Sequence, residues 1–323
     1  MSSTTHLLQR RPEEQTWVVV GPKHALAHLS PLIEAHSRHR PVRVVESNEL
    51  LASHLAGAAS VLWIGDPRRS PRTAIPGMFV RAADGRRVPA GWLPDVGQRL
   101  ADYGRAAAEV TLRQAPAARR GPFVLLGEFE RRALEWVGWF SDELPQNAGV
   151  FQWTAERIRR QDLIPALQVG AGAAFYFGRG TPLGWFGYGG FDQSDAAAAC
   201  GYPIGCIISF CCSVARRPAK GLSFCEELVL SGLCAAAIGS TRLSLHHRNV
   251  EWSLAFGNAL RRRESATLSD LLADPSIPLA ALNSYRILGD PMAPLIGHAD
   301  SRAQSAGVFA PAPDEALQVV PLR

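Results

Sequence analysis

The chain has 323 residues, 47% of them hydrophobic and 20% charged, which suits a packed globular protein with either two α/β lobes or one large domain. Its net charge is +5, but the basic pairs are scattered and form no stripe with interleaved aromatic residues, so we predict no nucleic-acid partner. No apolar stretch is long enough to span a membrane, and no secretory signal is visible at the N-terminus, so we predict a cytoplasmic protein that does not bind membranes.

Strands and helices alternate in the first third of the sequence. We expect strands at 16–20, 42–46 and 60–65, with helices at 25–37 and 49–56. A stretch rich in Pro, Gly and Arg at 66–89 is expected to form loops, and a helix then runs from about 95 to 112. This alternation favours a parallel sheet. Residues 1–15 are predicted to be a frayed N-terminus, and 16–113 a first α/β lobe.

Residues 114–121 are small, charged or helix-breaking and therefore predict a linker. The alternation then restarts, with strands expected at 123–126, 149–153, 173–178, 206–212 and 235–238, and helices at 131–144, 155–168, 226–234, 250–263 and 268–273. A structured element at 285–291 completes a second lobe at 122–296, and 297–323 is predicted to be a polar tail. The fold class is therefore α/β, with two parallel-rich lobes.

All six cysteines lie between residues 200 and 234. Cys211 and Cys212 are adjacent at the end of an expected strand, where neighbouring side chains point to opposite faces, so we expect Cys211 in the core and Cys212 at the sheet edge. The spacings contain no C-x-x-C, and we predict reduced thiols with no metal site and no cofactor. The strand that ends at Gly178 is followed by Arg179. We predict that the two strands are adjacent and parallel, with the Arg179 and Cys212 side chains within about 10 Å.

Several short motifs together indicate a family. They are Gly178-Arg-Gly180, Trp185, Cys212, Phe224-Cys-Glu226 and Gly289-Asp-Pro291 near Tyr285. With these motifs the second lobe resembles the catalytic domain of the gingipain-type cysteine peptidases, which have a caspase-like fold. In that family a strand ends in Gly-His-Gly with a Trp six residues after the His, so Arg179 stands at the position of the histidine. The resemblance implies that Cys212 is at the position of the nucleophile and that the second lobe is a caspase-like three-layer sandwich.

The first lobe is similar to the noncatalytic subdomain of the same family. Val61–Asp66 matches a strand that ends in Gly-Asp, and Gly91-Trp-Leu-Pro94 matches a turn before a helix, with Trp92 in place of an Arg. The resemblance therefore covers about 16 to 295 of this sequence.

The resemblance implies peptide-bond hydrolysis by a Cys212 thiolate on a peptide or protein substrate. A histidine would also protonate the leaving amine, whereas the guanidinium of Arg179 stays protonated and cannot transfer a proton. Two hypotheses stay open. The chain is a gingipain-like cysteine endopeptidase with an unusual dyad, or it is a catalytically inactive pseudopeptidase that binds a peptide or partner protein through the same groove.

Four further residues could belong to this site. His246 and His247 follow the expected loop 239–245, which leaves the same sheet edge, so one of them could replace the missing base. Glu128 lies just past the first strand of the second lobe and could orient a base or line a pocket for a basic side chain. Asp192 is a candidate for substrate binding.

Trp185 is the remaining candidate for substrate binding. A structural role is the alternative for several of these residues. Arg179 could be paired with Asp192 or Asp195, and the two histidines could be surface residues at a helix start.

Overall fold

The computed structural model describes residues 16–67, 75–113, 122–146, 148–199, 201–262 and 267–295. The predicted frayed N-terminus, the linker 114–121 and the tail 297–323 lie outside these residues.

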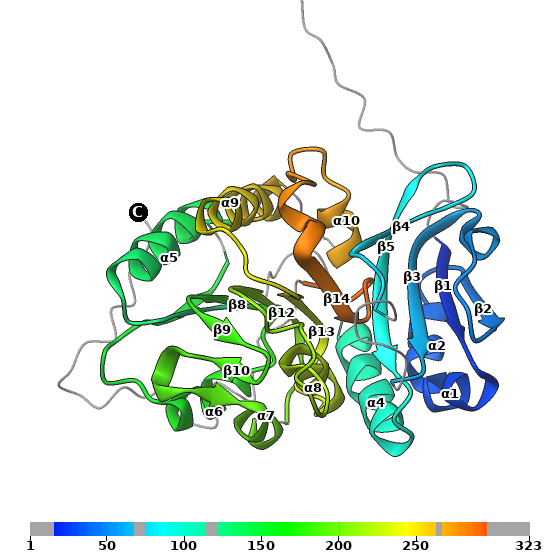
Figure 1. Cartoon of the computed structure of the whole chain (residues 1–323), viewed down its shortest axis with the longest axis horizontal. Coiled ribbons are helices and arrows are strands. Elements are labelled where there is room, and N and C mark those ends of the chain that lie inside the picture. Colours follow the sequence, from blue (N-terminus) through cyan, green and yellow to red (C-terminus); the bar gives the residue numbers. More distant parts are fainter. Residues whose placement is uncertain are drawn as a thin grey trace, which may run out of the picture.

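One mixed, largely parallel sheet runs through both predicted lobes (Figure 1). The order of its strands is β2 (Val42–Glu46), β1 (Thr16–Gly21), β3 (Ala58–Gly65), β5 (Arg87–Pro94), β14 (Tyr285–Gly289), β13 (Cys234–Ser240), β12 (Ile204–Phe210), β8 (Ala173–Phe177), β6 (Phe123–Gly127) and β7 (Val150–Trp153). Strand β14 is antiparallel to β13, and β4 (Phe79–Arg81) is antiparallel to β5. A small antiparallel sheet, β9 (Gly180–Thr181), β10 (Gly184–Trp185) and β11 (Phe191–Asp192), follows β8.

Helices cover the sheet and complete the predicted α/β fold. They are α1 (Lys23–His28), α2 (Ser30–Ser37), α4 (Gln98–Leu112), α5 (Arg131–Glu143), α6 (Arg160–Leu167), α7 (Gln193–Ala198), α8 (Phe224–Leu230), α9 (His246–Arg262) and α10 (Leu268–Leu272), with short 3-10 helices at Ala52–Leu55, Gly187–Gly189 and Ala281–Ser284. In the second lobe α5 and α9 lie over one face, and α6, α7 and α8 over the other (Figure 1). None of the helices described is both long and apolar enough to cross a bilayer.

Strand β14 joins the two lobes into one sheet. Its residues Ile287 and Leu288 pair with Gly91 and Trp92 of β5, while its other edge pairs with β13. Residues 87–89 were expected to lie in a loop and 91–94 in a turn before a helix, and this expectation was wrong. The sequence Arg87-Val-Pro-Ala-Gly-Trp-Leu-Pro94 contains two prolines and a glycine, yet seven of its eight residues are buried, because tertiary packing overrides the local preference for a loop.

Several helices begin elsewhere than expected, and α6, for example, begins at Arg160 rather than at 155. The expected helix 25–37 is interrupted at Leu29, and α2 starts afresh with Pro31 in its first turn, a position that proline favours. Helix α9 begins at His246 rather than at Val250. Both candidate histidines therefore stand in the first turn of a helix that covers the sheet.

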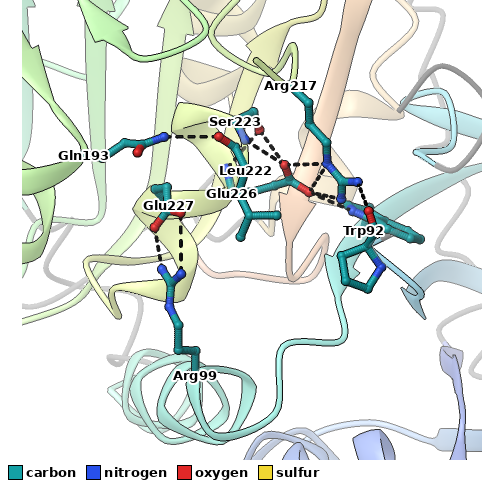
Figure 2. A network of polar contacts seen from close by, with 9 residues as sticks. Trp92, Arg99, Gln193, Arg217, Leu222, Ser223, Glu226 and Glu227 are labelled. Atoms are coloured by element: carbon teal, nitrogen blue, oxygen red, sulfur yellow. Dashed lines mark hydrogen bonds and ion pairs between the residues drawn. The ribbon is translucent and has the colours of Figure 1, made fainter. Parts of the chain in front are cut away.

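Buried polar contacts reinforce the junction between the lobes. Arg217 and Glu226 form an ion pair in which the side chains are 3% and 0% exposed, and both also bond to first-lobe residues (Figure 2). The Arg217 guanidinium donates to the Pro67 carbonyl at 2.6 Å, and the Trp92 indole donates to the Glu226 carboxylate at 3.2 Å. Further along, His36 of α2 contacts Asp290 at 2.7 Å with both side chains fully buried, so the Gly-Asp-Pro motif joins the two lobes.

Replacing Gly91 with alanine is expected to destabilise this junction by about 1–3 kcal/mol. A Cβ atom on Gly91 would lie 2.1 Å from the carbonyl oxygen of Gly289, so the two strands would have to move apart. Gly138 on α5 is a matched control because a Cβ there meets nothing within 4 Å, and Gly138→Ala should stabilise the helix by about 0.5–1 kcal/mol. Chemical denaturation of both variants measures the two effects, and equal stability of the two would contradict this account of the junction.

Candidate active site

The strands that precede Arg179 and Cys212 are neighbours. Strands β8 and β12 pair in parallel with Phe177 opposite Phe210, which confirms the predicted adjacency. Both chains then leave the sheet at its carboxyl edge. They stay close there, because a Cβ atom on Gly180 would lie only 2.9 Å from the carbonyl oxygen of Cys212. Only glycine fits this approach, so the Gly after Arg179 brings the two loops together.

Glu128 is the partner of Arg179. The carboxylate accepts hydrogen bonds from the Arg179 backbone amide at 3.0 Å and from Nε at 3.0 and 3.1 Å, and Nη2 of the side chain donates to it as well. The ion pair raises the pKa of the guanidinium further above its usual range, so Arg179 stays charged at any working pH. The suggested pairing with Asp192 or Asp195 was wrong.

This pairing also decides where the guanidinium lies. Glu128 follows β6, which pairs with β8 on the edge opposite β12, so the contact holds Arg179 toward β6 rather than toward Cys212. The guanidinium also lies over the ring of Phe186, 5.6 Å from its centroid, and the side chain remains 73% exposed.

Cys212 is partly buried under the segment that leads into α9. The Ser244 backbone amide donates to its sulfur at 3.4 Å, and the Ser244 hydroxyl lies 3.6 Å from it. The next residue, Ser213, has a φ of 61°, a left-handed conformation that L-residues seldom adopt. Such strain at a strand end is a feature that often accompanies function, and here it follows the residue at the nucleophile position directly.

His246 lies above the same sheet edge. Its ring makes an edge contact with Trp136 of α5 at 5.1 Å, and Trp136 in turn contacts Phe177 at 5.1 Å and Phe210 at 5.8 Å. Those two phenylalanines end the strands that lead to Arg179 and Cys212. The structure thus brings His246 into the neighbourhood of the candidate site. Both His246 and His247 are exposed residues at the start of α9, as the structural alternative predicted.

Trp185 and Asp192 are both engaged in local structure. Trp185 is 2% exposed, stacks on Tyr176 at 4.5 Å, and donates from its indole to the Ser209 hydroxyl at 3.0 Å. Asp192 caps the N-terminus of α7, and its bond to the Ser194 hydroxyl lowers the pKa of its carboxyl. Their role in substrate binding stays a prediction. Cys211 is buried, as expected for the neighbour of an edge residue.

Exposed apolar side chains surround this edge. They follow β6, lie between β9 and α7, or precede α9, and they are Phe129, Leu183, Phe186, Leu243 and Leu245, from 52% to 83% exposed. Scattered exposed apolar residues are ordinary, but a group of them around one edge indicates a binding surface.

Sequence reasoning missed Ser244 and Asn249. The Asn249 side-chain amide donates to the Ser244 hydroxyl at 2.8 Å and accepts from the Tyr285 hydroxyl at 2.8 Å. No local pattern marks these residues, because their contacts depend on how α9 packs on β14 and β12. Within the described ranges, no group of three or more His, Cys, Asp or Glu side chains is arranged to hold a metal ion.

Comparison with known proteins gives the family and supports the fold. The family model of peptidase family C25 matches residues 130–296. The fold is similar to the crystal structure of the Arg-specific cysteine proteinase gingipain R, with a TM-score of 0.66 at 12% identity, over 90% of this chain and 80% of that one. It is also similar to the complex of the pro- and mature domains of RgpB from Porphyromonas gingivalis, with a TM-score of 0.63 at 13% identity, over 87% and 79% of the two chains. No curated protein matches the sequence.

Proposed function

The chain belongs to peptidase family C25, and we propose that it binds peptide segments at the carboxyl edge of β8 and β12, with Cys212 as the reactive residue, and hydrolyses them poorly or not at all. The family acts on peptides or proteins, so a peptide ligand is its natural class. In the family reaction the thiolate attacks the scissile carbonyl carbon, the carbon–nitrogen bond breaks, and the amine leaves with a proton. Water then hydrolyses the thioester.

The ion pair between Arg179 and Glu128 carries this proposal. By its motif resemblance, residue 179 corresponds to the histidine of the family, and a guanidinium held by a carboxylate neither accepts the thiol proton nor supplies one to the leaving amine. Loss of general acid and base assistance costs about 100- to 10,000-fold in rate. A protein with this pair keeps the fold of the family but lacks the histidine that transfers the proton.

The exposed apolar residues around the edge support a preference for apolar peptides. Phe129 and Phe186 lie on the Arg179 side, and Leu243 and Leu245 flank the Ser244 contact with Cys212. Both oxygens of the Glu128 carboxylate are bonded to Arg179, so this carboxylate is not free for a basic substrate side chain.

A peptide with an electrophilic ketone at its C-terminal end tests the proposal. We expect an apolar peptide chloromethyl ketone to modify Cys212 faster than a basic one, with the site identified by peptide mapping, while fluorogenic peptides show no turnover. Cys212→Ala is the control. Labelling of Cys212 no faster than that of a thiol in the unfolded protein would overturn the proposal. Rapid hydrolysis of the fluorogenic peptides that depends on the Arg179–Glu128 pair would also overturn it.

One observation favours a second function, an active peptidase with His246 as the base. The segment that carries His246 contacts Cys212 through Ser244, and its ring rests on the tryptophan that packs against both strand ends. If the wild-type protein cleaves peptides, His246→Ala should abolish cleavage and His247→Ala should retain it. Equal cleavage by both variants would exclude His246.

A further inference from the structure

Ser244 provides the polar contacts of the Cys212 sulfur. Its backbone amide donates to the sulfur at 3.4 Å, and its hydroxyl oxygen lies at 3.6 Å. Both distances fall within hydrogen-bonding range for sulfur. The Ser244 carbonyl oxygen also lies 3.8 Å from the sulfur, where it can accept a hydrogen bond only from the neutral thiol. The sulfur therefore has three polar neighbours on Ser244, and two of them, the amide and the hydroxyl, can donate to it.

A buried chain of hydrogen bonds fixes the direction of the Ser244 hydroxyl. Tyr285 is fully buried, which raises the pKa of its hydroxyl well above the usual range and keeps it a donor. It donates to the Asn249 carbonyl oxygen at 2.8 Å, so the other side of that amide, Nδ2, donates to the Ser244 oxygen at 2.8 Å. The Ser244 oxygen already accepts one bond, and its hydrogen is free to point at the sulfur.

We propose, on the premise that Cys212 is the reactive residue of the proposed function, that Ser244 and Asn249 are positioning residues that direct two donors at the Cys212 sulfur. Hydrogen bonds to the charged form of a group favour that form, and the thiolate is the nucleophile. The two donors thus stabilise the Cys212 thiolate, which is part of what a cationic neighbour does for other reactive thiols. Asn249 is 4% exposed and acts through Ser244 without touching the sulfur.

The rate of alkylation of Cys212 by iodoacetamide tests this role. In that step the thiolate forms a carbon–sulfur bond, and iodide leaves. We expect Ser244→Ala and Asn249→Ala to slow the reaction at neutral pH by about 10-fold or more, the size expected when a hydrogen bond to a charged group is lost. The pH–rate profile should move to higher pH in both variants, and Ser244→Thr, which keeps a hydroxyl, should restore most of the rate.

Asn258→Ala is the matched control. Asn258 lies on the same helix, but its amide donates to Glu143 at 3.0 Å and has no link to Ser244. Its rate and pH profile should equal those of the wild type. Peptide mapping follows Cys212 alone, and thermal denaturation shows whether each variant is folded.

The outcomes separate this role from the proposed function. An unchanged rate and pH profile in folded Ser244→Ala, with Cys212 of the wild type labelled selectively, would overturn the positioning role and leave the proposed function standing. A wild-type Cys212 that reacts no faster than a thiol of the unfolded protein would overturn both. If Asn249→Ala unfolds, the comparison of Ser244→Ala with Ser244→Thr decides the result.

Discussion

Arg217→Met is expected to lower the free energy of unfolding by about 3–5 kcal/mol, because it leaves the Glu226 carboxylate buried without its cation. In the wild type the guanidinium contacts both carboxylate oxygens, at 2.6 to 3.1 Å, and the Glu226 side chain has no exposed surface. Methionine has a similar length, so the loss reflects the unpaired charge more than a cavity. The midpoint and slope of a urea titration measure it.

Figure 2 contains the matched control. Arg99 of α4 also reaches across the junction, to Glu227, the residue after Glu226, but these two side chains are 44% and 19% exposed. Water screens such a pair, so Arg99→Met should cost at most about 1 kcal/mol. A similar loss for both variants would show that the position of the arginine across the junction matters and that its burial does not. Replacing Glu226 as well, in Arg217→Met/Glu226→Leu, should recover part of the stability.

The order of elements in the second lobe followed from alternation of apolar runs with helical patterns, and the structure confirms it at β6, β8, β12 and β13. Strand β5 was not predicted from the sequence, because its prolines and Gly91 lower its local preference for a strand. It is buried between β3 and β14, and β14 lies almost two hundred residues later in the sequence. A pairing between strands so far apart in the sequence cannot be recognised from the residues of either strand alone.

The candidate site was likewise predicted only in part from the sequence. Arg179 and Cys212 could be placed at one edge because parallel strands deliver their following residues there. The pairing of Arg179 with Glu128 was not identified, although both residues were named, since both edge loops offered acids and only the strand order β8-β6 selects one. Ser244 was missed altogether, because a serine before a helix has the same appearance whether it caps the helix or contacts a thiol.

Arg179→His is expected to give peptide hydrolysis at least about 100-fold above that of the wild type, the lower end of what general acid and base catalysis contributes. The scaffold for a histidine is already present. Glu128 accepts from the backbone and side chain of residue 179, so its carboxylate is placed to accept a ring N–H and orient the imidazole. Gly180 still brings the loop against Cys212, whose sulfur keeps its contact with Ser244.

Three further variants define the result. Arg179→His/Cys212→Ala should be inactive, which assigns the gained activity to the thiol. Arg179→His/Glu128→Gln should lose much of the gain, because an amide does not stabilise an imidazolium as a carboxylate does. Arg179→Lys, which keeps a charge near Glu128 but has no group that titrates near neutral pH, should stay at the wild-type level. If folded Arg179→His still labels Cys212 with the peptide ketone but cleaves nothing, Arg179 is not what prevents hydrolysis, and the loss lies in how the edge holds the scissile bond.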